Sequence, residues 1–262
     1  SASVDKAVIL AVIALASFLS ALMGSSINVA LPSIGRDFAV DAITLSWIAT
    51  AYVLAVAMVL VPVGKLADIY GRQRLFLYGT IGWGLVSLLC GLALSAPVLI
   101  GLRALQGLAG AMVGATSVAI VTSAYPPGER GRALGITVSA TYSGLAMGPF
   151  IGGIMTQQLG WRSLFLLNAV LGAAMVAVII AKMKAERIDA RGQRLDLAGS
   201  AIFGLTLLAI MYGFTVLPAL LGAGLILAGV LGLAVFVWWE LRVPNPVLDI
   251  DLFRHNVVFA LS

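Results

Sequence analysis

Charged residues are scarce in this chain of 262 residues. Only 10% of its residues are charged and 61% are hydrophobic, whereas soluble domains carry about 25% charged residues. So little charge cannot supply a folded domain with a polar surface. Composition therefore excludes an ordinary soluble domain and indicates that much of the chain lies in lipid.

Cysteine and histidine are nearly absent, with one of each, Cys90 and His255. A lone cysteine excludes an internal disulfide and a paired-cysteine metal site, and His255 has no neighbouring ligand set, so we expect no metal. The phosphate-loop, zinc-protease and serine-hydrolase motifs are also missing, since the one Gly-Lys pair, at 64–65, is followed by Leu66. We expect neither an enzyme nor a cofactor.

Long apolar runs are what the chain has in abundance. A membrane-spanning helix needs about 20 apolar residues, and eight runs reach that scale. The strands of a membrane barrel would alternate over about 10 residues, which these runs do not. The sequence therefore predicts an all-α membrane protein with spans near residues 7–31, 46–63, 75–94, 98–122, 134–158, 162–181, 195–215 and 220–240.

The basic residues follow the topology of these spans. With the N-terminus in the cytoplasm, all but Arg36, Arg103 and Arg162 of the sixteen Lys and Arg residues fall on the cytoplasmic side. This asymmetry obeys the positive-inside rule and predicts a multi-pass protein of the inner (plasma) membrane. Because the charges are spread over short loops, the net charge of +5 does not indicate a nucleic-acid partner.

The segment between the second and third spans reads GKLADIYGRQR, residues 64–74. Gly64 and Gly71 permit a tight turn and close helix approach, and Asp68 and Arg72 are four residues apart, while Arg74 meets the lipid surface. The segment resembles the loop signature of the major facilitator superfamily. The resemblance implies a conformational latch in which Asp68 closes the cytoplasmic side against the other half of the transporter.

Arg103 lies inside the fourth span, about 9 Å from its outer end. Such a charge is costly unless it faces water or a partner, and snorkelling to the outer interface is the alternative. Gln106, Gly107, Gly110 and Gly114 share its helix face, which favours a packed polar stripe. The run resembles the R-x-x-Q-G motif of the same superfamily, which implies a role in proton transfer for Arg103 together with Gln106.

The fifth span carries glycines at 144, 148 and 152, with Pro149 and Gly153. The glycines predict a groove for close helix contact, and Pro149, which removes a backbone donor, is expected to kink the helix; a helix-dimer motif is the alternative. The run resembles the antiporter motif of the superfamily, G-x-x-x-G-P-x-x-G-G, which is characteristic of its exporters. This resemblance favours efflux over uptake.

The first span ends in Asn28-Val29-Ala30-Leu31-Pro32, which resembles the first span of drug/proton antiporters with fourteen spans. Those proteins usually carry an aspartate five residues before the asparagine, where this chain has Met23. Proton coupling then depends on acids elsewhere. Substrate-cavity candidates are Met23, Asn28, Trp47, Tyr52 and Tyr142, since Met and aromatic side chains suit varied apolar guests, although each also suits ordinary helix packing.

The resemblance implies a major facilitator-type six-helix N-terminal bundle over 1–182, a basic cytoplasmic linker over 183–194 and a two-helix hairpin over 195–240. Residues 241–262 then form a cytoplasmic loop and the start of a further span. Fourteen spans need about 280 residues, more than this chain has. We therefore expect the remaining helical bundle to be a partner, in the same chain or a second one.

The expected function is secondary active export of small hydrophobic or cationic compounds by alternating access, in exchange for protons. Its partners are the lipid bilayer, a small-molecule substrate and protons. A non-transporting scaffold or regulator on a transporter frame would explain Met23 but needs neither the glycine groove nor the latch. An importer or a lipid exporter of the same superfamily remains an alternative.

Overall fold

The computed structural model describes residues 2–183 and 196–243. Within these ranges the chain forms eight α-helices, each long and apolar enough to span a membrane. The predicted all-α membrane architecture is confirmed. The helices are α1 (Ala2–Phe38), α2 (Ala42–Tyr70), α3 (Arg72–Gly91), α4 (Ala96–Ala124), α5 (Pro127–Leu159), α6 (Arg162–Lys182), α7 (Leu197–Val216) and α8 (Leu220–Glu240).

The helices continue beyond the apolar runs from which they were predicted. α1 passes through Pro32 to Phe38, and the expected loop at 64–74 is helical except at Gly71. Hydropathy detects only the lipid-soluble part of a helix, whereas backbone hydrogen bonds extend it until a cap or break stops it. Gly71, with φ +101°, supplies the break between α2 and α3 because its backbone conformation is unfavourable for other residues.

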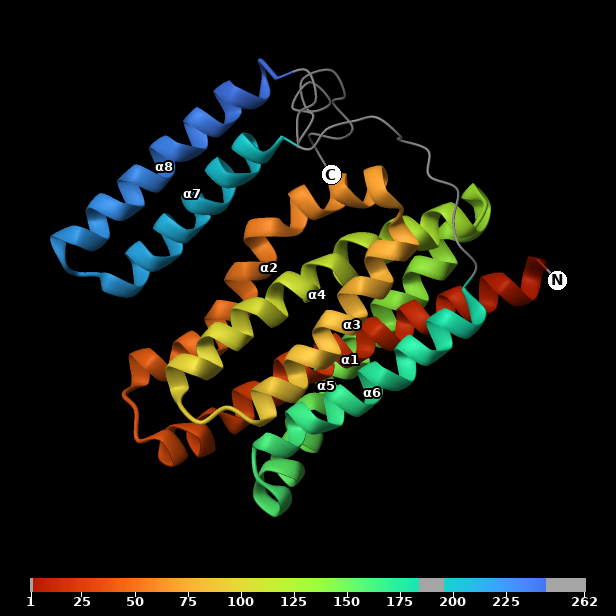
Figure 1. Ribbon diagram of the computed structural model, residues 1–262, viewed down its shortest axis with the longest axis horizontal. Coiled ribbons are helices and arrows are strands. Elements are labelled where there is room, and N and C mark those ends of the chain that lie inside the picture. The colour runs from red at the N-terminus through yellow and green to blue at the C-terminus, as the bar shows by residue number, and fades with distance from the viewer. Residues whose placement is uncertain (1, 184–195, 244–262) are drawn as a thin grey trace.

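The first six helices form one bundle, and α7 and α8 form a pair at its side (Figure 1). α1 packs along α5, α4 packs against α2 and α3, and α6 packs against α3. The α7–α8 pair meets the bundle at α2, where the rings of Trp47 and Tyr212 lie 5.9 Å apart. The predicted linker at 183–194 and the predicted segment at 241–262 lie almost wholly outside the described residues.

Glycines bring the helix backbones close together. A Cβ atom at Gly107 of α4 would lie 2.5 Å from the Tyr52 carbonyl oxygen of α2, and one at Gly172 of α6 would lie 3.1 Å from the Gly84 Cα of α3. Both spacings are shorter than ordinary van der Waals contact. In lipid the hydrophobic effect does not drive helices together, and small residues allow the close van der Waals packing that does.

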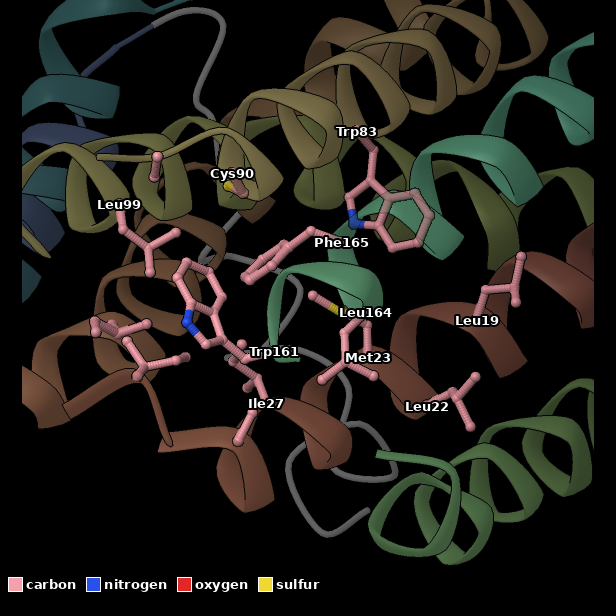
Figure 2. Close-up of a cluster of buried hydrophobic side chains, with 14 of the residues drawn as sticks. Leu19, Leu22, Met23, Ile27, Trp83, Cys90, Leu99, Trp161, Leu164 and Phe165 are labelled. Atoms are coloured by element: carbon pink, nitrogen blue, oxygen red, sulfur yellow. The ribbon is translucent and has the colours of Figure 1, made fainter. Parts of the chain in front are cut away.

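The apolar core fills the space between α1, α3, α4 and α6. Figure 2 shows Met23 and Ile27 of α1 among side chains from α3, α4 and the start of α6. The rings of Phe38 and Phe165 flank that of Trp161 edge-on, with centroids 5.5 and 6.0 Å away. This core fixes one end of the bundle, and a second cluster around Phe76 and Ile120 lies between α1, α3, α4, α5 and α6.

Candidate functional site

A buried polar cluster surrounds Arg103 in α4. Its side chain is 2% exposed, its Nε donates to the Ile48 carbonyl oxygen of α2 at 3.1 Å, and its Nη1 donates to the Gln106 side-chain oxygen. Gln106 in turn donates to the Ser87 hydroxyl of α3 at 2.6 Å. The guanidinium lies over the Tyr52 ring, 4.5 Å from its centroid.

Among the described residues, the partners that hold Arg103 in this cluster are all uncharged groups. In residues 2–183 and 196–243 the ion pairs are Asp68–Arg72 and Asp37–Arg162, and neither reaches it. A buried charge is tolerated only when hydrogen bonds compensate for lost water, and here a carbonyl, an amide and a ring face do so. The cluster ties α2, α3 and α4 together and places a fixed positive charge inside the bundle.

The glycines of the fifth span pack directly on α1. A Cβ at Gly144 would overlap the Phe18 carbonyl oxygen, and one at Gly152 would lie 2.8 Å from the Ser26 Cα. Between them, the Ser26 hydroxyl donates to the Gly148 carbonyl oxygen at 2.8 Å. The two backbones therefore touch over about two helical turns, and no larger residue fits at these glycines without separating the helices.

The remaining motif residues of α5 lie off this contact. Pro149 is exposed, and it leaves α5 continuous from Pro127 to Leu159. Gly153 is half-buried, with only Val29 near its Cβ position, at 3.9 Å. The structure thus divides the motif into a face packed on α1, formed by Gly144, Gly148 and Gly152, and residues turned away from it.

The latch residues surround the break between α2 and α3. Arg72 donates through Nε to Asp68 at 2.9 Å, and its Nη2 lies 2.8 Å from the same carboxylate oxygen. Arg74 is exposed, and a Cβ at Gly64 would meet no atom within 4 Å. The described part of the chain therefore gives Gly71 a conformational reason for being glycine, but gives Gly64 no steric one.

The five cavity candidates do not come together in one place. Met23 is 3% exposed, and its sulfur accepts from the Asn168 side-chain amide at 2.7 Å. Trp47 packs on Tyr212 and Tyr52 lies beneath Arg103, while Asn28 and Tyr142 are exposed. Met23, where the fourteen-span relatives are expected to carry an acid, thus occupies the apolar core in contact with α6.

A hollow of about 420 Å³ lies between α1, α4 and α5. Its polar lining is a set of hydroxyls, those of Ser17, Ser20, Ser117, Thr137 and Thr141. Ser20 links the hollow to the Arg103 cluster, since its Oγ lies 3.4 Å from the Tyr52 hydroxyl. The sequence patterns did not identify this hollow because its residues come from three separate helices and share no motif.

A second arginine cluster lies near the N-terminal end of α4 and was not predicted from the sequence. Arg162 at the start of α6 pairs with Asp37 of α1 at 2.6 Å and donates to the Ala93 carbonyl oxygen at 3.2 Å. Its guanidinium lies 4.2 Å from the Trp161 ring, and Trp161 Nε1 donates to Asp37 at 3.1 Å. The available signal was that Asp37 and the Trp161-Arg162 pair fall on the same predicted side of the membrane.

In residues 2–183 and 196–243, no three His, Cys, Asp or Glu side chains converge. The family model described as Major Facilitator Superfamily matches residues 13–240.

The chain belongs to the major facilitator superfamily. It is 37% identical over 254 residues to the multidrug resistance protein Stp of Mycobacterium tuberculosis, which covers 94% of this chain and 46% of Stp. It is 36% identical to the puromycin resistance protein pur8 of Streptomyces alboniger, over 95% of this chain and 50% of that protein. The chain therefore spans about half the length of these curated relatives.

Not every similar protein is named for drug resistance. The riboflavin transporter RibZ of Clostridioides difficile is 33% identical over 76% of this chain and 44% of its own length. Among solved structures, a bacterial homolog of the human lysosomal transporter Spinster, in an inward-facing and unoccupied conformation, gives a TM-score of 0.62. The match covers 90% of this chain and 61% of that one at 19% identity, which supports the fold alone. Membership in this superfamily confirms the expected resemblance and the multi-pass plasma-membrane location, and it places the chain among transporters rather than enzymes.

Proposed function

We propose that the chain forms the N-terminal part of an exporter of small apolar compounds that works by alternating access in exchange for protons. The observation that carries this proposal is the α1–α5 contact. Three glycines of a motif that resembles the exporters' antiporter motif lie so close to α1 that a side chain added at any of them would collide with it. The names of Stp and pur8 as resistance proteins favour the same direction of transport.

The α1–α5 contact supplies a rigid element for that cycle. Repeat-built transporters rock one helical bundle against another around a site near the middle of the membrane. Bundles that move as units need internal contacts that do not slide, and a backbone-to-backbone contact with an inter-helix hydrogen bond resists sliding. In this proposal the missing C-terminal helical bundle supplies the opposite wall, and Gly64, Asp68 and Arg74 meet it at the latch.

The Arg103 cluster is the part of this half that we assign to proton coupling. A guanidinium does not give up its proton in proteins, so Arg103 acts as a fixed charge rather than as a proton carrier, and the acid that carries the proton lies elsewhere in the transporter. Tyr52 and Ser20 connect it to the hollow. A substrate that binds at Ser20 thereby reaches the same group of side chains that would sense the proton.

A second candidate function is vitamin transport, which is favoured by the similarity to the riboflavin transporter RibZ. Riboflavin carries an apolar ring system with several hydrogen-bonding groups, so it would use the same hollow. The two candidates differ in cargo, and a direct uptake assay with riboflavin separates them.

Export is tested with the full-length transporter in cells that lack their own efflux pumps, by following the loss of preloaded ethidium and puromycin. We expect energy-dependent loss of at least one compound, and Gly148→Leu to abolish it because the leucine collides with Ser25 and Leu22 of α1. The matched control is Gly135→Leu in the same helix, where a Cβ meets no atom within 4 Å. Loss of both compounds at the rate of cells without the transporter contradicts the proposal.

A further inference from the structure

Among the residues that the structure describes, the lining of the hollow between α1, α4 and α5 has hydroxyl groups but no charged side chain. The rest of its surface comes from glycine and aliphatic residues such as Gly110, Val113 and Leu145. Its volume of about 420 Å³ falls in the range of small-molecule sites. This hollow therefore presents one wall on which an apolar molecule can lie and form a few polar contacts.

Three of the five hydroxyls that line the hollow, those on α4 and α5, have already used their hydrogens. Ser117 donates to the Val113 carbonyl oxygen at 2.6 Å, Thr137 donates to Leu134 at 2.7 Å, and Thr141 donates to Thr137 at 3.0 Å. Each bond runs back along the side chain's own helix. A hydroxyl has one hydrogen and two acceptor lone pairs, so these three oxygens remain able to accept but not to donate.

The α4 and α5 side of the wall therefore distinguishes ligands that can donate a hydrogen bond from ligands that cannot. At Ser117, Thr137 and Thr141 a ligand hydroxyl or N–H finds acceptors, whereas a ligand oxygen without a hydrogen meets other oxygens there and loses its bond to water without replacement. A ligand cation finds no carboxylate among the described residues of the wall and lies near the fixed charge of Arg103, which Tyr52 and Ser20 connect to the hollow. Burying an unpaired charge is costly.

We infer that this hollow binds neutral, largely apolar molecules that carry hydroxyl or N–H donors, in preference to donor-free or permanently cationic ones. The inference rests on the proposed function, because it assigns a substrate class to the exporter. Of the hydrophobic or cationic compounds expected from the sequence, it keeps the neutral hydrophobic ones. Ser117, Thr137 and Thr141 are the specificity-determining residues.

A matched pair of ligands tests the hydrogen-bond sense directly. Binding of 7-hydroxyflavone and of its methyl ether to the full-length transporter in nanodiscs is measured by calorimetry, at a pH where the phenol is neutral. One hydrogen bond is worth about 0.5–1.5 kcal/mol net, so the hydroxyl compound should bind about two- to tenfold more tightly. Tetraphenylphosphonium, a donor-free cation, should bind more weakly than 7-hydroxyflavone.

The variant Thr137→Val/Thr141→Val removes two acceptor oxygens while keeping the side-chain shape, and the preference for the hydroxyl compound should fall toward one. Thr122→Val is the matched control, because Thr122 donates to its own helix in the same way but lies outside the hollow. Because the readout is a ratio of two affinities on one preparation, a partly unfolded sample does not mimic it, and Thr141→Val alone serves if the double variant fails to fold.

The outcomes separate this inference from the proposed function. Equal affinity for the two flavones, tighter binding of the ether, no binding of either, or a preference that survives the double variant overturns the inference. If ethidium or puromycin is still exported in those cases, the proposed function stands. If full-length cells export no compound at all, the exporter proposal fails and the assignment of a substrate class fails with it.

Discussion

The two arginine clusters stabilise a positive charge in opposite ways, one with uncharged partners and the other with a carboxylate. Arg103 is 2% exposed and is held by a carbonyl, an amide and an aromatic ring, whereas the Arg162 side chain is 40% exposed and pairs with a carboxylate. An exposed ion pair is weak because water competes for both partners. A buried cation depends strongly on each neutral partner because water is absent, so the cluster without an acid should be the more sensitive one.

The largest effect is expected when Gln106 is replaced by leucine. Gln106→Leu leaves an Arg103 N–H buried without its acceptor and removes the donor to Ser87. A hydrogen bond to a charged group contributes about 1.5–3 kcal/mol, and we expect a loss of unfolding free energy of that size. SDS titration of the full-length protein in mixed micelles measures it, and a loss below that of Asp37→Asn would break the comparison.

A second substitution should relieve part of this loss. In Arg103→Leu/Gln106→Leu the uncompensated charge is gone, and replacing both members of a buried polar pair by apolar groups is often close to neutral. We expect the double variant to recover about 1 kcal/mol or more over Gln106→Leu in the same titration. Additive losses would mean that the two side chains are not coupled in the way that their contact indicates.

Breaking the exposed pair should matter less. Asp37→Asn removes the charge that faces Arg162, and water competes for both partners of an exposed pair, while the amide oxygen can still accept the Trp161 hydrogen bond. The expected loss is therefore smaller than that of Gln106→Leu and shrinks further in high salt, because salt screens exposed charges. A salt-independent loss as large as that of Gln106→Leu would contradict this ranking.

The smallest effect concerns Asp41, four residues from Asp37 and at the start of α2. Hydrogen bonds from Thr44 hold the pKa of this carboxyl below its ordinary value of 3.8. A depressed folded-state pKa contributes stability above the unfolded pKa, and that stability is lost as pH falls through the folded value. Amide exchange at Thr44 should therefore become faster, relative to the intrinsic rate, below about pH 4, and Asp41→Asn should remove this dependence.

The sequence predicted what depends on local pattern. The spans follow from apolar length, and the burial of Arg103 follows from the polar and glycine residues that share its helix face. Asp37 and Arg162 could not be paired, because they are separated by 125 positions in the chain and no periodicity connects them. The hollow could not be predicted for the same reason. The contact of Met23 with Asn168 also could not be predicted, because it depends on how α1 and α6 cross.

The most direct test of the account uses vesicles containing the full-length transporter and records luminal pH when puromycin is added. We predict substrate-driven proton movement that falls at least about tenfold in Arg103→Lys, because a lysine ammonium cannot reproduce the planar fork of donors, and that persists in Asp37→Asn. Proton movement of unchanged size in Arg103→Lys would show that the buried cluster takes no part in coupling, and would contradict the role assigned to it.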